Sequence, residues 1–535
     1  MSTDERVGAD RAVPLRRADG VTEAERYLKK LCDRSFLSLW SYPGVYRDQG
    51  RGGKAGDGKE VCDLLVVFED HIIIFSDKDC QFPNTGDIEL DWSRWYRKAI
   101  QKSAEQVWGA ERWIKTYPDR LFLDRACTQP FPLDLPDPAR AKFHRVVVAH
   151  DGARRCWEEL RGSGSLMIAP DIIGPAHCTS LADGGRPFMV GQVDPSRGFV
   201  HVFDDTTLDV VMRMLDTVTD FVSYLEKKEK FILSGRLCWA AGEEDLLAYY
   251  LKYINEAEEH DFVIPEDLNF VSIGEGLWEH FTRSPERRNQ QLADEISYSW
   301  DMLIEKFLHH IFENTQHYTT CADLKEQEKM FRFLAREPRT RRRMLAKSII
   351  ELISRTPVAA QRAARVMLPS RPGDPHYVFL LLTPFKGATY EEYREVRREL
   401  LSAYCMVVKL KCPEALDIIG IATETGDGES RSEDAVYLDA RDWPAEAEAE
   451  ARRLQDELEL LRETAMFTST ENEYPEGRVT LSPVSDQRQS RETGRPNAKR
   501  SKRPSQAHKN KIGRGAPCPC QSGKTFRRCC GKESS

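Results

Sequence analysis

The stretch that decides the fold is VCDLLVVFEDHIIIFSDK, residues 61–78. It contains two apolar runs of strand length, 61–68 and 71–78, with only Glu69 and Asp70 between them. Short β-branched and aromatic runs on either side of a two-residue polar break are typical of a β-hairpin. We therefore expect two antiparallel strands joined by a tight turn.

The register of this hairpin decides which polar side chains can meet. If the two acidic residues form the turn, residues whose numbers sum to 139 face one another, so Asp63 lies opposite Ser76. Because side chains alternate between the two faces of a strand, Asp63, Ser76 and Lys78 share one face and Asp77 points to the other. A turn longer by one residue would exchange Asp77 and Lys78. A charged Asp in an apolar strand needs a partner, so these residues form either a structural ion pair or a functional site.

Further elements are predicted on both sides of the hairpin. Residues 22–39 have apolar side chains at three- and four-residue spacing with Glu23 and Glu25 at the start, which predicts an amphipathic helix. The sequence Ser-Tyr-Pro-Gly at 41–44 is expected to end it. A long helix is predicted at 92–117.

The order of these elements resembles that of a known nuclease core. The predicted order is similar to that of the PD-(D/E)xK core: a helix with an acid, a strand with Asp, a strand ending in x-Lys and then a long helix. Residues 20–150 resemble the restriction-endonuclease-like domains typified by NERD and Mrr, in which a Gln recurs on the long helix; Gln106 is the matching position, and a further strand is expected at 144–150. Taken alone, Gln106 would be an ordinary exposed helix residue. The resemblance implies an α/β nuclease-like domain at 21–235, with its core at 21–150.

The resemblance also implies roles for individual residues. Asp63 and a second carboxylate would hold Mg²⁺, Lys78 would help to activate the attacking water, and Glu25 or Glu23 would be the assisting helix acid. Ser76 stands where the family has the second carboxylate, and a hydroxyl is a far weaker Mg²⁺ ligand. Either the fold is kept without cleavage, or another acid substitutes, the candidates being Asp77, Glu60 and Glu111.

The rest of the chain is expected to form further folded segments. Residues 240–440 have a mixed, mainly helical pattern with α/β character from 376 onward. The basic run RTRRR at 339–343 is either a solvated helix end or a contact for nucleic acid. The remaining segments are a disordered start at 1–20, an irregular Gly- and Pro-rich insertion at 151–198, a strand at 199–203, a helix at 208–229 and a terminal helix at 445–463.

Charge separates the body of the chain from its tail. The formal net charge is −8, but residues 478–535 contain 15 Lys or Arg and three acids and so carry +12, which leaves −20 for residues 1–477. Residues 464–513 have few large apolar side chains and are expected to be a flexible basic linker. Such a linker is either a plain tether or a salt-sensitive contact for the phosphates of DNA or RNA.

The last folded segment is predicted at 514–532. Its sequence APCPCQSGKTFRRCCG, residues 516–531, holds two close cysteine pairs separated by eight residues: Cys518, Cys520, Cys529 and Cys530. Four thiolates around a tetrahedral Zn²⁺ suit this spacing. Disulfides are the competing interpretation, but adjacent cysteines do not readily bridge each other. The pattern resembles the SEC-C motif, the small zinc module at the C-terminus of the SecA translocation ATPase that also occurs on many other bacterial proteins.

The SEC-C resemblance implies a structural zinc ion and a basic surface for docking onto a protein or a nucleic acid. Gln521 departs from the family, which usually has Gly there, but this position supplies no metal ligand. Zinc held by four thiolates has no open coordination position, so we expect no catalysis at this metal. The alternative is that zinc only folds a tail too short to fold alone.

These observations predict a cytoplasmic protein of bacterial type. No apolar run approaches the length of about 20 residues needed to cross a bilayer, and the N-terminus lacks the apolar segment of a secretory signal. The function we expect is metal-dependent cleavage of DNA or RNA. The alternative is a non-catalytic adaptor that keeps the nuclease-like fold and docks through the zinc module.

Overall fold

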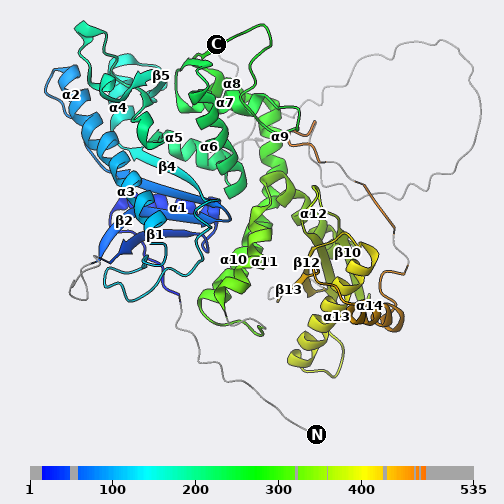
Figure 1. Cartoon of the computed structure of the whole chain (residues 1–535). Coiled ribbons are helices and arrows are strands. Elements are labelled where there is room, and N and C mark those ends of the chain that lie inside the picture. The colour runs from blue at the N-terminus through cyan, green and yellow to red at the C-terminus, as the bar shows by residue number, and fades with distance from the viewer. Residues whose placement is uncertain are drawn as a thin grey trace, which may run out of the picture. The chain divides into compact units, whose positions relative to one another are not determined.

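The computed structural model describes residues 15–48, 58–319, 323–357, 360–425, 431–462, 465–468 and 471–476. All of these belong to one unit of the chain, Met1–Val479, and a second unit comprises Thr480–Ser535. The four predicted zinc ligands, the cysteine-rich module and most of the predicted linker therefore lie outside the described residues. The described part is a mixed α/β structure, as expected, and its strands form three sheets (Figure 1).

The first sheet has the predicted hairpin near its centre, in the strand order β1-β2-β3-β4-β7. The β1–β2 and β2–β3 pairs are antiparallel, whereas β3–β4 and β4–β7 are parallel. Its elements are α1 (Glu23–Phe36), β1 (Ser41–Arg47), β2 (Lys59–Phe68), β3 (His71–Lys78), α2 (Ile88–Trp95), a π-helical turn (Tyr96–Gln101), α3 (Lys102–Thr116), β4 (Lys142–Ala149) and β7 (His201–Asp204).

The predicted hairpin register is confirmed. Leu64 pairs with Phe75 and Phe68 with His71, so partners sum to 139 along the ladder. Helix α1 also begins as predicted, because Thr22 and Glu25 form a capping box at its start. The regular pairing of β2 with β3 ends at Leu64 and Phe75, one residue before Asp63.

Residues 41–44 differ from the prediction, since they begin strand β1 and do not merely end a helix. Ser41 pairs with Val66, and Pro43 pairs with Leu64. Proline lacks a backbone N–H, and for this reason it is found in sheets chiefly on edge strands. Strand β1 is such an edge, and Pro43 is compatible with it.

Helices α1 and α3 cover opposite faces of this sheet. The ring of Phe36 in α1 contacts the ring of Phe75 in β3, with centroids 6.4 Å apart. The next residue, Ser76, donates a hydrogen bond to Gln106 in α3. Because adjacent residues of a strand point to opposite faces, Ser76 and its face of the hairpin lie under α3.

Residues 151–198 are more ordered than the predicted irregular insertion. They contain α4 (Gly152–Leu160), β5 (Met167–Ile173) and β6 (Met189–Gln192). Strands β5 and β6 join β8 (Leu237–Ala240) and β9 (Val271–Ile273) in a second sheet of order β6-β5-β8-β9. The strands are short and separated by turns, and their partners come from a later part of the chain, so their local sequence gave little sign of a sheet.

The helix predicted at 208–229 is two helices. Helix α5 (Thr207–Met214) ends before Asp216, and Thr217 caps the start of α6 (Val218–Leu233) by accepting the N–H of Asp220. The mainly helical region that follows is confirmed. It contains α7 (Glu243–Lys252), α8 (Leu277–Arg283), α9 (Pro285–Asp294), α10 (Tyr298–Phe312), α11 (Leu324–Arg336) and α12 (Arg339–Arg355).

The basic run at 339–343 is neither a solvated helix end nor a free basic surface. Arg339, Arg342 and Arg343 are at most 9% exposed. Each donates to a carboxylate at 2.7–2.8 Å, the partners being Asp216 and Asp301 for Arg339, Asp301 for Arg342 and Asp294 for Arg343. These arginines instead hold α12 against α10, α9 and the start of α6.

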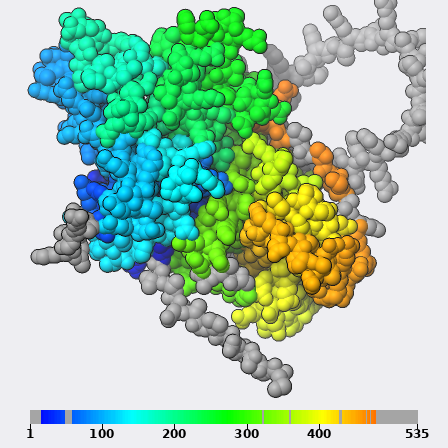
Figure 2. All heavy atoms as spheres, viewed as in Figure 1, coloured from blue at the N-terminus to red at the C-terminus, as the bar shows by residue number. Residues whose placement is uncertain are grey.

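The third sheet has the order β10-β11-β12-β13 and confirms the α/β character predicted from 376 onward. Its elements are β10 (Arg362–Met367), β11 (His376–Leu382), α13 (Tyr390–Lys411), β12 (Asp417–Glu424), β13 (Asp434–Asp439) and α14 (Ala445–Leu458). Tyr377 and Phe379 of β11 join the main core, whereas Val378 and Leu380 join a separate core under α13. Strand β11 is therefore buried on both faces, and this part of the chain, yellow to orange, forms a contiguous mass in Figure 2.

Within the residues that the structure describes, every helix is too short or too polar to span a bilayer.

Candidate functional site

The predicted residues of the first sheet meet around the Asp63 side chain. Its Oδ2 accepts the backbone N–H of Asp77 at 2.6 Å, just where the regular pairing of β2 and β3 has ended. Its Oδ1 accepts the side-chain amide of Gln106 at 3.4 Å, and Ser76 Oγ donates to Gln106 Oε1 at 3.2 Å. Gln106 thus bridges Asp63 and Ser76 across the face that lies under α3.

Gln106 has this position because the long helix is continuous from α2 to α3. Residues 88–116 run through α2, the π-helical turn and α3 without a break. A π-helical turn inside a longer helix is rare and is frequent at functional sites. The helix covers β2, β3 and β4, and Gln106 is half-buried, not fully exposed as an ordinary surface residue would be.

Charged groups around Asp63 interact with one another. Burial raises the pKa of Asp63 to about 6, and the negative charges of Asp77 and Glu25 add to this rise, while Lys78 opposes it. Burial likewise raises the pKa of Glu60 to about 7, together with the charges of Asp63 and Glu25, and Lys78 again opposes the rise. The predicted Asp, Lys and helix acid therefore lie within electrostatic range of each other.

Lys78 does not form the structural ion pair that was one interpretation of Asp63. The Lys78 side chain is exposed, and within the described part of the chain no carboxylate lies within 4.0 Å of its Nζ. Asp63 is held by neutral donors, the N–H of Asp77 and the amide of Gln106. Lys78 thus remains available to a ligand at this face.

Three other predicted acids have partners of their own. Glu25 Oε2 accepts the N–H of Val21 at 2.6 Å as part of the α1 cap, and Glu23 is exposed in the same turn. Asp77 pairs with His150, the residue that follows strand β4. Burial lowers the pKa of His150, but the contact with Asp77 outweighs this effect and raises it. Glu111 is ion-paired with Arg145 and Lys115 at 2.5 and 2.6 Å.

Glu60 is therefore the acid best placed to serve with Asp63. The oxygens of Glu25, Glu60 and Asp63 are not gathered into one cage: among the described residues, sets of three ligand atoms within 4.8 Å of one another occur at His71, His144 and Glu226 and at His376, Cys412 and Glu414. Mg²⁺ commonly uses one or two carboxylates together with water and substrate phosphate. Asp63 and Glu60 are compatible with that kind of binding.

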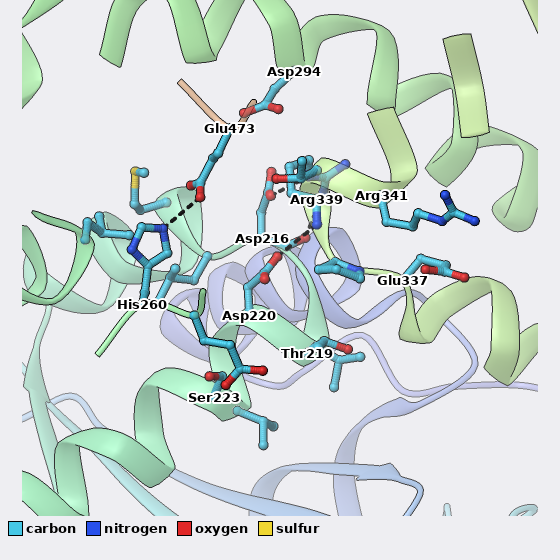
Figure 3. A pocket seen from close by; sticks show the side chains of 18 of the residues that line it. Asp216, Thr219, Asp220, Ser223, His260, Asp294, Glu337, Arg339, Arg341 and Glu473 are labelled. Atoms are coloured by element: carbon cyan, nitrogen blue, oxygen red, sulfur yellow. Dashed lines mark hydrogen bonds and ion pairs between the residues drawn. The ribbon is translucent and has the colours of Figure 1, made fainter. Parts of the chain in front are cut away.

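A large cavity, which was not predicted, lies elsewhere in the same unit (Figure 3). Its volume is about 1390 Å³, and its walls come from α6, α7, α9, the start of α12 and residues 471–474. Glu473 accepts His260 Nε2 at 2.8 Å and the Gln290 amide at 2.7 Å. Residues 471–474 were expected in a flexible linker, but here they are held in the wall of the cavity.

Most charged groups in this cavity are paired. Asp216 accepts Arg339 Nε at 2.8 Å, and Asp220 accepts the backbone N–H of Arg339 at 3.0 Å, as Figure 3 shows. Burial raises the pKa of Asp220 and, against the effect of Arg343, that of Asp294. The only hint of this cavity in the sequence was the arginine run, because its other walls are far apart along the chain.

Comparison with known proteins identifies the tail. The family model of the SEC-C motif matches residues 516–532, a span that includes all four cysteines of the predicted module. This motif is typically zinc-binding, and the SEC-C part of the prediction is therefore confirmed. No curated protein and no solved structure matches the chain.

Proposed function

We propose that the first sheet carries a metal-dependent, nuclease-like site that hydrolyses phosphodiester bonds in DNA or RNA. The observation that supports it is the half-buried Asp63, joined through Gln106 to Ser76 and lying within electrostatic range of Glu60 and Lys78. The order α1, β2 with Asp63, β3 ending in Ser76-x-Lys78 and then the long helix agrees with the PD-(D/E)xK order that the sequence resembles.

The residues would divide the chemistry as follows. Asp63 and Glu60 would hold Mg²⁺, which when bound supplies Lewis-acid assistance to attack on the phosphorus atom. Lys78, exposed beside them, would orient the attacking water and stabilise negative charge on the phosphate. Because the pKa of Glu60 is about 7, a proton must leave Glu60 for it to act as a ligand near neutral pH.

The basic tail supports a polyanionic substrate. Residues 478–535 carry +12, opposite in sign to the −20 of the rest of the chain. Lys and Arg residues that neutralise phosphates bind with an affinity that falls steeply with salt. We propose that this segment and the SEC-C module bind a nucleic acid, or a protein associated with it.

A second function is favoured by one observation. Ser76 occupies the position of the second carboxylate, is fully buried and donates its hydroxyl hydrogen to Gln106. A buried hydroxyl that already donates to another side chain is a poor Mg²⁺ ligand. If Glu60 does not replace it, the domain would bind nucleic acid without cutting it and the protein would act as an adaptor.

The test is a cleavage and binding assay on single- and double-stranded DNA and RNA with Mg²⁺ or Mn²⁺. Purified full-length protein is compared with Asp63→Asn, Glu60→Gln and Lys78→Ala, and with Lys98→Ala as a control at an exposed lysine on the π-helical turn. We expect cleavage by the wild type and the control only.

The other outcomes are distinct. Salt-sensitive binding without cleavage by any form would favour the adaptor. Cleavage that persists in both Asp63→Asn and Lys78→Ala would show that the active site lies elsewhere. Loss of cleavage in Asp63→Asn and Lys78→Ala but not in Glu60→Gln would leave Asp63 as the metal ligand and exclude Glu60.

A further inference from the structure

Two histidines and a glutamate meet where the first sheet borders the large cavity. His71 is the first residue of β3, His144 lies in β4 and Glu226 lies in α6. His71 Nδ1 is 3.0 Å from His144 Nε2 and 3.9 Å from Glu226 Oε1, and all three ligand atoms lie within 4.8 Å of one another. This cluster is separate from the Asp63 site, which lies toward the other end of the hairpin.

The parallel pairing of β3 with β4 brings the two histidines together. Ile73 pairs with His144, and His71 pairs with Lys142, so the histidines are diagonal neighbours on one face of the sheet. Their rings are stacked, with centroids 5.3 Å apart and planes 19° apart. Helix α6 supplies Glu226, whose Oε1 is 3.9 Å from His71 Nδ1.

We infer that His71, His144 and Glu226 form a divalent-metal site, suited above all to Zn²⁺, with an open coordination position toward the cavity. Zinc binds histidine nitrogen at about 2.0–2.1 Å, so tetrahedral ligand atoms are about 3.3 Å apart. The distances of 3.0 and 3.9 Å from His71 Nδ1 to its two neighbours lie on either side of this value. Two histidines and one glutamate are also the ligand set of known catalytic zinc sites.

Burial acts on both histidines of this cluster. Burial lowers the pKa of His144 to about 3, and the neighbouring His71, Lys142 and Arg145 add to this effect. Burial also lowers the pKa of His71, although Glu226 opposes the change. Burial thus disfavours the protonated form of both imidazoles, and neutral imidazole is the form that ligates metals.

The surroundings allow a ligand to reach the metal. His144 is 3% exposed and would anchor the ion from within the sheet, whereas His71 and Glu226 line the cavity of about 1390 Å³. A zinc ion with three protein ligands keeps a fourth position for water or an exogenous ligand, unlike the closed four-thiolate site predicted in the tail. An anionic oxygen, from a carboxylate or a phosphate, would suit that position.

One neighbour competes with the metal. Lys142 Nζ is 2.9 Å from Glu226 Oε1, and its side chain is 55% exposed. The alternative to a metal site is a plain hydrogen bond between two neutral imidazoles, with Glu226 paired only to Lys142. Only the metal site predicts tighter metal binding when Lys142 is removed.

The experiment measures zinc content and Co²⁺ binding of the full-length protein. We expect two metal ions per chain, one in the tail and one here. His71→Gln and Glu226→Gln should each lose one of them, with affinity falling by more than the roughly 10- to 100-fold that loss of an outer-sphere partner causes. The control His309→Gln, at an exposed histidine that belongs to neither of the clusters found among the described residues, should keep both.

Spectroscopy distinguishes this site from the tail. Co²⁺ bound by thiolates gives strong near-ultraviolet charge-transfer absorption, which a site with only nitrogen and oxygen ligands lacks. His71→Gln should therefore lose the part of the visible Co²⁺ absorption that comes from the histidine site and keep the charge-transfer band of the tail, while Cys529→Ser should weaken the charge-transfer band and keep the visible absorption of the histidine site. Circular dichroism checks that each variant is folded.

The metal affinity of Lys142→Met tests the site directly, because a purely structural role of the two histidines and Glu226 predicts no change in it. Removing the competing ammonium should tighten metal binding by about 2- to 5-fold, in line with the worth of an exposed ion pair. Unchanged zinc content in both His71→Gln and Glu226→Gln would overturn the inference. So would an affinity for Co²⁺ that does not increase in Lys142→Met.

Discussion

Replacing Asp63 by Asn should stabilise the protein while it removes the proposed metal ligand. The folded protein raises the pKa of this carboxyl from 3.8 to about 6. The folded state therefore holds a proton that the unfolded state has lost between these two values, and the free energy of unfolding falls as pH rises through this window. One pKa unit corresponds to 1.36 kcal/mol, so the ionised carboxylate costs at most about 3 kcal/mol above pH 7.

Asparagine can occupy the same position without that cost. Its carbonyl oxygen can still accept the N–H of Asp77, and Gln106 can rotate its amide so that its oxygen accepts from the new amide nitrogen. Gln106 would then donate to the Ser76 hydroxyl, and every polar group of the cluster keeps a partner.

Urea unfolding in Mg²⁺-free buffer measures this effect at about pH 4 and about pH 8. We expect Asp63→Asn to exceed the wild type by about 1–3 kcal/mol in the free energy of unfolding at the higher pH and by much less at the lower pH. Mg²⁺ at about 100 times its Kd should add about 2.7 kcal/mol to the wild type and nothing to the variant.

Two results would refute this reasoning. A variant that is less stable than the wild type at both pH values would show that the carboxylate contributes more through its hydrogen bonds than its burial costs. Equal stabilisation of the wild type and the variant by Mg²⁺ would show that Asp63 is not a metal ligand. The expected result is a variant that is more stable than the wild type but lacks the proposed metal ligand.

Three further predictions concern other parts of the chain. Arg342→Met should lower the free energy of unfolding by about 3–5 kcal/mol, because it removes the donor of two backbone carbonyl groups, those of Glu337 and Ala335, and leaves Asp301 with Arg339 alone. The half-exposed Arg355→Met should cost less than about 1 kcal/mol, and chemical denaturation compares the two variants. Asp77→Asn should lower the pKa of His150, which Asp77 now raises, and NMR titration of the imidazole would detect this; an unchanged His150 titration would contradict the contact. Cys529→Ser should remove the zinc of the SEC-C module, measured as zinc per chain, and retention of that zinc would exclude this cysteine as a ligand.

The hairpin and its polar face could be predicted because their causes are local. Two strand-length apolar runs on either side of Glu69 and Asp70 allow one compact turn, and a two-residue turn determines the register. The register then assigns Asp63 and Ser76 to one face, and the structure joins them through Gln106. The start of α1 was also predictable, since its capping box lies within four residues.

Partners distant in the sequence could not be predicted in the same way. Pro43 indicated a turn, and only pairing with β2 makes its segment an edge strand. The run at 339–343 was expected at the surface because arginine is costly to bury, and carboxylates from three other segments make that burial possible.

The sequence by itself therefore determined the zinc module, the charge division of the chain and the face of the hairpin that holds Asp63, since each depends on residues close together along the chain. The tertiary structure alone decided the large cavity and the meeting of His71, His144 and Glu226. Those three residues come from two strands and a helix, with more than 70 residues between each and the next. No local pattern records such a meeting, because it depends on the parallel pairing of β3 with β4 and on the packing of α6.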